Sequence, residues 1–143
     1  MSKAINPGMN IKELQDEIIE DFEFMEDWED KYQYIIDLGK ELPAFPEEFR
    51  DEDHKVKGCV SQVWLHAREE GNTIIFQGDS DAFIPKGLIA LLMRVYSGQD
   101  KQEIATTPPY FIEKIGLGQN LSPSRTNGLF SMVKKIQAIA ASN

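Results

Sequence analysis

The 143-residue chain contains a single cysteine, Cys59, within the stretch KVKGCVSQVWLHAR. Cysteine reacts as its thiolate, and neighbouring positive charges lower the pKa of a thiol from about 8.5. His54, Lys55 and Lys57 precede the cysteine, and Gly58 adjoins it. We therefore expect an accessible, activated thiolate at the point where a loop enters a strand.

A lone activated thiolate is suited to two kinds of chemistry. It can hold a persulfide, because no second thiol of the same chain can attack that persulfide, release sulfide and close a disulfide. It can instead act as a redox sensor that forms mixed disulfides. A third interpretation is inert packing, since free cysteines are among the most buried residue types.

Other chemistries lack the residues they require. Structural zinc takes four nitrogen or sulfur ligands, whereas this chain has one cysteine, two histidines and no C-x-x-C pair. Neither G-x-x-x-x-G-K-[ST] nor G-x-G-x-x-G occurs, so a phosphate or dinucleotide cradle has no support. The spacing of His54 and His66 from Cys59 does not indicate that an imidazole reaches the sulfur. We expect no metal and no cofactor on this chain.

Length and composition predict one domain. One cysteine excludes an internal disulfide, and no stretch has the pattern of a secretion signal. The longest apolar segment, GLIALLM, is far shorter than the roughly 20 residues that span a bilayer. We expect a cytoplasmic protein without a membrane partner, with a flexible leader at residues 1–8 and a single domain over residues 9–143.

Charge is unevenly distributed along the chain. Residues 1–53 hold 17 acidic and 5 basic side chains, and residues 54–143 hold 7 and 10, for a net charge of −9. Nucleic-acid binding depends on Lys and Arg that neutralise phosphates, so we expect no nucleic-acid partner. The acidic blocks are typical of a solvated helix face, and a basic protein partner is the alternative.

Apolar periodicity predicts helices at both ends of the chain and strands between them. An N-cap at Asn10 starts a helix that runs to about Asp27, and a second helix covers residues 28–38 and ends at Gly39 as its left-handed C′ residue. The following stretch, ELPAFPEEFRDEDHKVKG, reads as a long loop of the kind that is often functional.

Two segments after this loop, residues 60–68 and 73–77, predict a hairpin around Gly71 and Asn72. Val63, Leu65 and Ala67 occupy the presumed core face of the first strand. A buried helix follows GDSDA, short helices cover residues 100–105 and 109–115, and the stretch SPSRTNGLFSMVKKIQAIA gives a final helix. This order of N-terminal helices, a small antiparallel sheet and C-terminal helices predicts an α+β fold.

Three blocks of the sequence resemble the SufE family, including its CsdE branch: GCVSQVWL, QGDSDAFIPKGLIALL and LGQNLSPSRTNGL. The blocks occur in the family order and the similarity extends over nearly all of residues 9–140. The resemblance implies an α+β fold similar to the IscU-type scaffold proteins. It also implies a sulfur-acceptor protein that works with a cysteine desulfurase rather than as a stand-alone enzyme.

The resemblance places Cys59 at the position of the family's persulfide acceptor. Its implied role is to take a sulfur from a PLP-dependent desulfurase of the SufS or CsdA type, to stimulate that enzyme and to pass the sulfur to an iron–sulfur assembly scaffold. The PLP would belong to the partner. The alternative function remains a redox-sensing protein with one reactive cysteine.

Arg125 is the second candidate, since a cation in the first turn of a helix opposes the helix dipole and needs tertiary compensation. It is suited to orienting the cysteine loop, stabilising anionic sulfur or binding the partner, and an ion pair to a nearby acid is the alternative. Asp79, Ser80 and Asp81 lie at a strand-to-helix junction and are expected to cap the helix or to support the cysteine loop.

Gly58, Ser61 and Gln62 complete the expected site as neighbours of Cys59. Gln62 and Trp64 share the strand face opposite the presumed core, where they would line the cysteine site or cover a second apolar layer.

Overall fold

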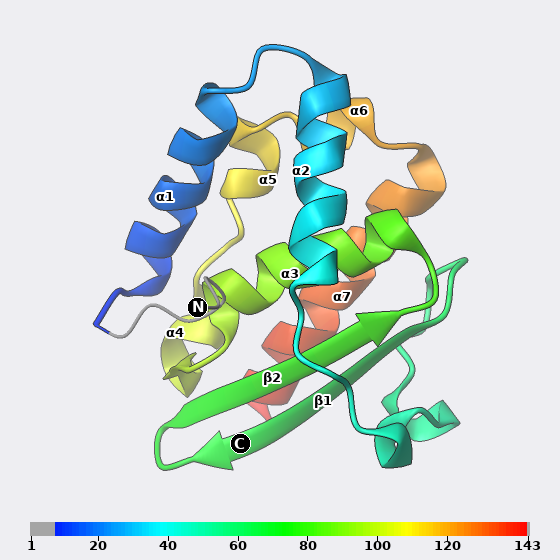
Figure 1. Ribbon diagram of the computed structural model, residues 1–143. Helices are drawn as coiled ribbons and strands as arrows, with labels where there is room; N and C mark the ends of the chain where they lie inside the picture. Colours follow the sequence, from blue (N-terminus) through cyan, green and yellow to red (C-terminus); the bar gives the residue numbers. More distant parts are fainter. Residues whose placement is uncertain (1–7, 143) are drawn as a thin grey trace.

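Two consecutive helices open the fold in the computed structural model, which describes residues 8–142 (Figure 1). α1 (Ile11–Glu23) begins with the expected cap: Asn10 accepts the Glu13 N–H at 2.8 Å, and the Glu13 carboxylate accepts the Asn10 N–H at 3.0 Å. α1 ends before the predicted Asp27, because Asp27 is extended and caps α2 (Trp28–Lys40). Of the predicted leader, residues 1–7 lie outside the described residues.

Gly39 does not end α2 as a left-handed C′ residue, and that prediction was wrong. It is a buried helical residue at which a Cβ would lie 2.8 Å from the backbone nitrogen of Gly87 on α3 (Phe83–Tyr96). A Cβ at Gly87 would lie 2.1 Å from the carbonyl oxygen of Ile35. The two glycines therefore allow α2 and α3 to cross in backbone contact.

The predicted hairpin is confirmed, with shifted ends. β1 (Val63–Glu70) pairs antiparallel with β2 (Thr73–Ser80) in a register that places Val63 opposite Ser80. Gly71 makes the turn with a φ of 62°. A third strand that the sequence did not predict, β3 (Gln99–Asp100), pairs with the start of β2.

The two faces of this sheet have different coverings. Val63, Leu65 and Ala67 of β1 face the hydrophobic core as predicted, and β2 packs against α3. The opposite face is covered by residues 41–56 of the predicted loop, which form the covering segment. This segment contains two 3-10 turns, η1 (Glu47–Phe49) and η2 (Glu52–His54). The ring of Phe49 stacks on His66 with 3.8 Å between centroids.

The remaining helices close the core. They are α4 (Lys101–Thr106), α5 (Phe111–Lys114), α6 (Leu117–Asn120) and α7 (Pro123–Ala141). α7 contacts both α3 and α4, and Leu129, Met132, Val133 and Ile136 are its buried stripe. The α+β prediction is confirmed by this arrangement. No helix within residues 8–142 has the length and apolar character needed to cross a membrane.

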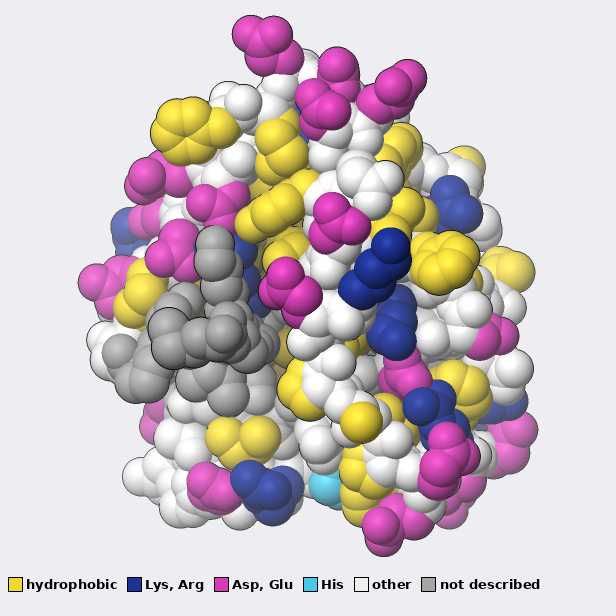
Figure 2. Space-filling model, in the orientation of Figure 1, with side chains coloured by type: hydrophobic (Ala, Val, Ile, Leu, Met, Phe, Trp, Pro, Cys, Tyr) yellow, Lys and Arg dark blue, Asp and Glu magenta, His cyan; other side chains and the backbone are white. Residues whose placement is uncertain are grey.

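Acidic side chains gather over the connection between α1 and α2, at the top of the view in Figure 2. Glu23 at the end of α1 and Glu26 and Asp27 in this connection are exposed, as are Glu29 and Asp30 at the start of α2. This surface lies at the N-terminal helices, whereas the cysteine lies at the end of the hairpin.

Candidate functional site

A short closed loop presents Cys59. The Val56 N–H donates to the carbonyl oxygen of Val63 at 2.9 Å, and Lys55 pairs with Trp64 as an isolated antiparallel bridge. These contacts close residues 57–62 into a loop, which lies at the end of the sheet where β1 begins and β2 ends (Figure 1). The predicted strand start at residue 60 is therefore too early, because residues 60–62 belong to the cysteine loop.

The loop rests on α7 through glycine contacts. Gly58 has a φ of 93°, and a Cβ there would lie 2.5 Å from the Oγ of Ser131. The Cys59 thiol donates to the carbonyl oxygen of Gly128 at 3.6 Å, and a Cβ at Gly128 would lie 3.4 Å from the Cys59 Sγ. Small residues on α7 thus let the cysteine loop lie against the helix backbone.

The thiol opens onto a pocket of about 290 Å³ between the loop, α3 and the first turns of α7. Its lining residues are Cys59, Val60, Ser61, Val63, Pro85, Leu88, Ser122, Ser124, Arg125, Gly128 and Met132. Three predicted site residues, Cys59, Ser61 and Arg125, therefore meet around one cavity. Val60 at its rim is 84% exposed.

The electrostatic environment of Cys59 differs from the sequence expectation. Burial raises the pKa of the Cys59 thiol, so the resting cysteine is not the activated thiolate that its basic neighbours predicted. Lys55 is paired with Glu52 at 3.1 Å, and the Nδ1 of His54 lies 2.7 Å from Asp51. Both side chains are thus engaged within the covering segment, and the thiol is half-buried and protonated at neutral pH.

Gln62 is held by the residues that connect β2 to α3. Its backbone N–H donates to the Oδ1 of Asp81 at 3.1 Å, and its side-chain amide donates to the Oδ2 at 3.3 Å. The carbonyl oxygen of Gln62 accepts the Ser80 hydroxyl at 2.7 Å and the Asp81 N–H at 3.3 Å. Ser80 and Asp81 therefore support the cysteine loop.

Helix capping, the other role expected of Asp79, Ser80 and Asp81, is only partly fulfilled. The N-cap of α3 is Ala82, and no side chain bonds to the helix from that position. The Ser80 hydroxyl accepts the Ala82 N–H at 3.2 Å, which fixes the residue before the helix.

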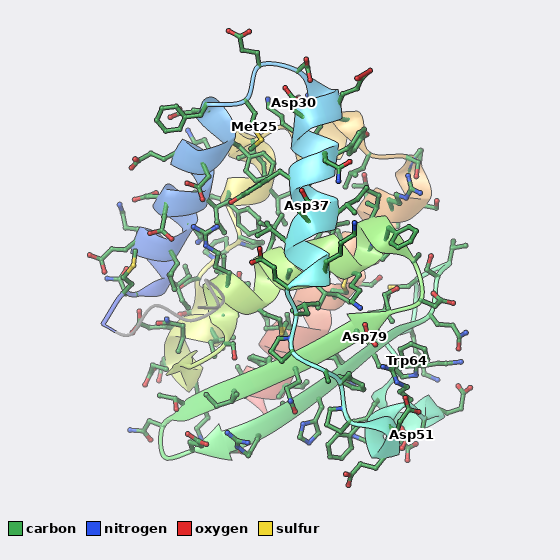
Figure 3. All side chains as sticks on the ribbon, in the orientation of Figure 1. Met25, Asp30, Asp37, Asp51, Trp64 and Asp79 are labelled. Carbon is green, nitrogen blue, oxygen red and sulfur yellow. The ribbon has the colours of Figure 1, made fainter. Side chains whose placement is uncertain are left out.

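Asp79 instead anchors the covering segment. Its carboxylate is buried and lies 2.6 Å from a guanidinium nitrogen of Arg50 and 3.4 Å from the Nζ of Lys86. Arg50 also lies over the rings of Trp64 and Phe45, at 5.3 and 5.5 Å from their centroids. Figure 3 shows Asp79 and Trp64 at the same end of the hairpin. Trp64 therefore belongs to a second apolar layer rather than to the cysteine pocket.

Arg125 lies in the first turn of α7, as predicted, and its N–H is within 3.4 Å of the Oγ of Ser122, the N-cap. The residue is exposed, and its guanidinium has no ion pair within the described part of the chain. The alternative in which a nearby acid neutralises Arg125 therefore does not hold. A free cation remains at the pocket that contains the cysteine.

Gly128, Ser131 and Arg50 are among the residues of the site that were not predicted from the sequence. Gly128 and Ser131 contact the cysteine loop from a helix more than 60 residues away in the chain, so no local pattern marks them. Arg50 carried a weak signal, since it follows Phe49 in a segment otherwise rich in acids. Among residues 8–142, no cluster of three or more His, Cys, Asp or Glu side chains could hold a metal ion.

The fold and site define a small α+β protein with one half-buried cysteine on a closed loop. A family model described as "SufE: Fe-S metabolism associated domain" matches residues 16–140. The chain belongs to the SufE family and is thereby associated with iron–sulfur metabolism.

Relatives of known sequence agree with this assignment. An uncharacterized SufE-like protein of Rhizobium etli is 52% identical over 127 residues, covering 85% of this chain and 86% of the relative. An uncharacterized SufE-like protein of Rhizobium meliloti is 45% identical over 130 residues, covering 87% and 93%. The solution structure of a hypothetical protein from Thermus thermophilus has the same fold, with a TM-score of 0.75, 22% identity and coverage of 90% and 94%.

Proposed function

We propose that this protein accepts a persulfide sulfur on Cys59 from a PLP-dependent cysteine desulfurase and delivers it to iron–sulfur cluster assembly. The observation that carries the proposal is the position of Cys59 in a closed loop beside a pocket, in a chain of the SufE family. The PLP belongs to the desulfurase, and the acceptor stimulates that enzyme because it removes the sulfur that blocks the next turnover.

The transfer is a thiol exchange. The Cys59 thiolate attacks the terminal sulfur of the donor's cysteine persulfide, a new sulfur–sulfur bond forms on Cys59, and the donor thiolate leaves. No net oxidation occurs, and the single cysteine prevents intramolecular release of the sulfur as sulfide.

The resting structure holds this chemistry back. Burial raises the pKa of the thiol, and its proton is directed to the carbonyl oxygen of Gly128. For attack, Cys59 must move away from α7. This movement separates the thiol from the groups that favour its neutral form. Opening of a short loop costs far less free energy than global unfolding, so docking of the donor is able to drive it.

The raised pKa also weighs against the redox-sensor alternative. Peroxide-sensing cysteines are accessible and have low pKa values, because oxidation begins at the thiolate. Cys59 is half-buried and its pKa is shifted in the opposite direction. A partner that opens the loop fits this site better than a small diffusing oxidant.

The test is the intact mass of the protein after incubation with a SufS-type or CsdA-type desulfurase, PLP and L-cysteine. We expect the mass to rise by one sulfur and to return on reduction, and Cys59→Ser to remain unchanged. A protein that gains no sulfur from either donor, while Cys59 still reacts with an alkylating reagent, would contradict the proposal.

A further inference from the structure

The pocket beside Cys59 is larger than a sulfur carrier alone requires. One added sulfur atom occupies a volume comparable to that of a water molecule, whose share of the liquid is about 30 Å³. The pocket holds about 290 Å³, so most of it would remain open after Cys59 had accepted a sulfur. Ligand pockets commonly begin near about 300 Å³, which places this cavity at the size of a small molecule.

The charge of the lining is unusual for this protein. The chain has a net charge of −9, yet among the described residues no carboxylate lines the pocket, and Arg125 is its one charged residue. Ser122 and Ser124 add hydroxyl groups beside it. The cavity is thus an electropositive site in an acidic protein, and it favours an anion.

α7 places this charge near the sulfur. Arg125 and Gly128 are three residues apart on one helix and therefore share a face, and Gly128 is the residue that the Cys59 thiol contacts. The N-terminus of this 19-residue helix opens to the same pocket through Ser122 and Ser124, and its dipole adds to the positive field. Val63, Leu88 and Met132 add apolar side chains to the lining.

We infer that this pocket binds a small thiol that carries a carboxylate, and that this thiol can take the sulfur from Cys59. The inference rests on the proposed persulfide at Cys59 and adds a class of acceptor to it. Arg125 binds the carboxylate, the apolar side chains of the lining contact the carbon chain, and the thiol group meets the loaded cysteine.

The packing of Cys59 directs the attack. Its Sγ lies 3.6 Å from the carbonyl oxygen of Gly128, which leaves no room for a second sulfur on that side, so α7 shields the inner sulfur of a persulfide and the outer sulfur turns toward the pocket that Cys59 lines. The bound thiolate attacks the outer sulfur, a bond forms between these two sulfurs, and the bond to Sγ breaks. Cys59 leaves as a thiolate and takes a proton, and the small molecule becomes the persulfide, without net oxidation.

The test uses Cys59 loaded with one sulfur by inorganic polysulfide, so that it does not depend on a desulfurase. Loss of the sulfur is followed by intact mass after addition of 3-mercaptopropionate or the uncharged 2-mercaptoethanol, and the small persulfide is trapped by alkylation. The ratio of the two rates is compared between variants, because the intrinsic reactivity of each thiol cancels in that comparison.

We expect Arg125→Gln to lower the preference for 3-mercaptopropionate by about three- to fivefold, as for loss of one solvent-accessible ion pair. Arg125→Lys should retain part of the preference, and added salt should reduce it in the wild type. Lys134→Gln removes one exposed charge from α7 outside the pocket and should leave the ratio unchanged.

Equal ratios in the wild type and Arg125→Gln, or a mixed disulfide on Cys59 in place of a small persulfide, would overturn the inference and leave the proposed function intact. A Cys59 that neither polysulfide nor a desulfurase can load would overturn both. A loaded protein that shows the preference, but gains no sulfur from any desulfurase, would overturn the proposed donor alone.

Discussion

Asp81 and Gln62 form a two-point contact between the connection from β2 to α3 and the cysteine loop: the two carboxylate oxygens of Asp81 accept the backbone N–H and the side-chain amide of Gln62 at 3.1 and 3.3 Å. Both residues are exposed, so solvent competes for these bonds. The contact therefore holds the loop with a small free energy. We expect its strength to set how often Cys59 separates from α7.

Asp81→Ala should loosen the cysteine loop while the fold remains intact. Removal of two exposed hydrogen bonds, each contributing about 0.5 kcal/mol, should raise the rate of Cys59 alkylation about fivefold. The rate is measured with iodoacetamide at neutral pH, beside the free energy of unfolding, which should fall by less than about 1.5 kcal/mol.

Asp81→Asn is the matched control, since its amide oxygen can still accept the Gln62 N–H. It should lie between the wild type and Asp81→Ala in alkylation rate. An alkylation rate that is the same in all three proteins would show that this contact does not control access to Cys59.

Gly58→Ala should destabilise the protein more than Gly71→Ala. Both glycines have positive φ, at 93° and 62°, and an alanine in the left-handed region costs about 1–2 kcal/mol. Only Gly58 adds a clash, because its Cβ would lie 2.5 Å from the Oγ of Ser131, whereas nothing lies within 4 Å at Gly71. Chemical denaturation measures both free energies of unfolding.

Ser131→Ala separates the two contributions at Gly58. It removes the clashing hydroxyl. The double variant Gly58→Ala/Ser131→Ala should therefore regain the stability lost to the clash and still lose the stability that the backbone conformation costs. If Gly58→Ala costs no more than Gly71→Ala, the loop does not rest on α7 as the structure shows.

Most of the fold follows from local patterns. Asn10 and Gly71 have one dominant local role each, as helix cap and turn, and both were predicted correctly. Gly39 was misassigned because a glycine near a helix end also permits close helix crossing, and only the position of Gly87 on α3 decides between these roles. The short pairing of β3 depends on where α3 returns the chain, which no local pattern specifies.

The site was predictable where the chemistry of a single residue or the family pattern marks it. Cys59 and Arg125 stand in blocks that carry the SufE resemblance, and the structure brings both to one pocket. The thiol's environment was not predictable, because sequence neighbours such as Lys55 pair elsewhere and burial against Gly128 comes from a distant helix. Proximity in sequence is a weak guide to a pKa when side chains of adjacent residues point away from each other.

Arg50→Met should destabilise the covering segment. The substitution leaves the buried carboxylate of Asp79 with Lys86 at 3.4 Å and removes the contact of the guanidinium with Trp64. We expect the free energy of unfolding to fall by about 2 kcal/mol. This loss is smaller than the roughly 3–5 kcal/mol that follows when one partner of a fully buried ion pair is removed.

Arg68→Met is the control for Arg50→Met, because the Arg68–Glu70 pair is exposed and should contribute less than about 1 kcal/mol. A loss at Arg50 no larger than that at Arg68 would show that Asp79 does not need its partner.

The pH dependence of Cys59 alkylation should report the burial of the thiol. Because burial raises the pKa of Cys59, the midpoint of the alkylation rate in the native protein should lie above that of the same chain in denaturant, which is about 8.5. The native state then binds its thiol proton more tightly than the unfolded state, so this proton stabilises the fold below the unfolded pKa. That contribution is lost as pH rises through the folded pKa. Cys59→Ser should lack this part of the alkaline loss of stability. A native midpoint at or below that of the unfolded chain would instead indicate a thiolate activated in the resting state, and a loop that need not open.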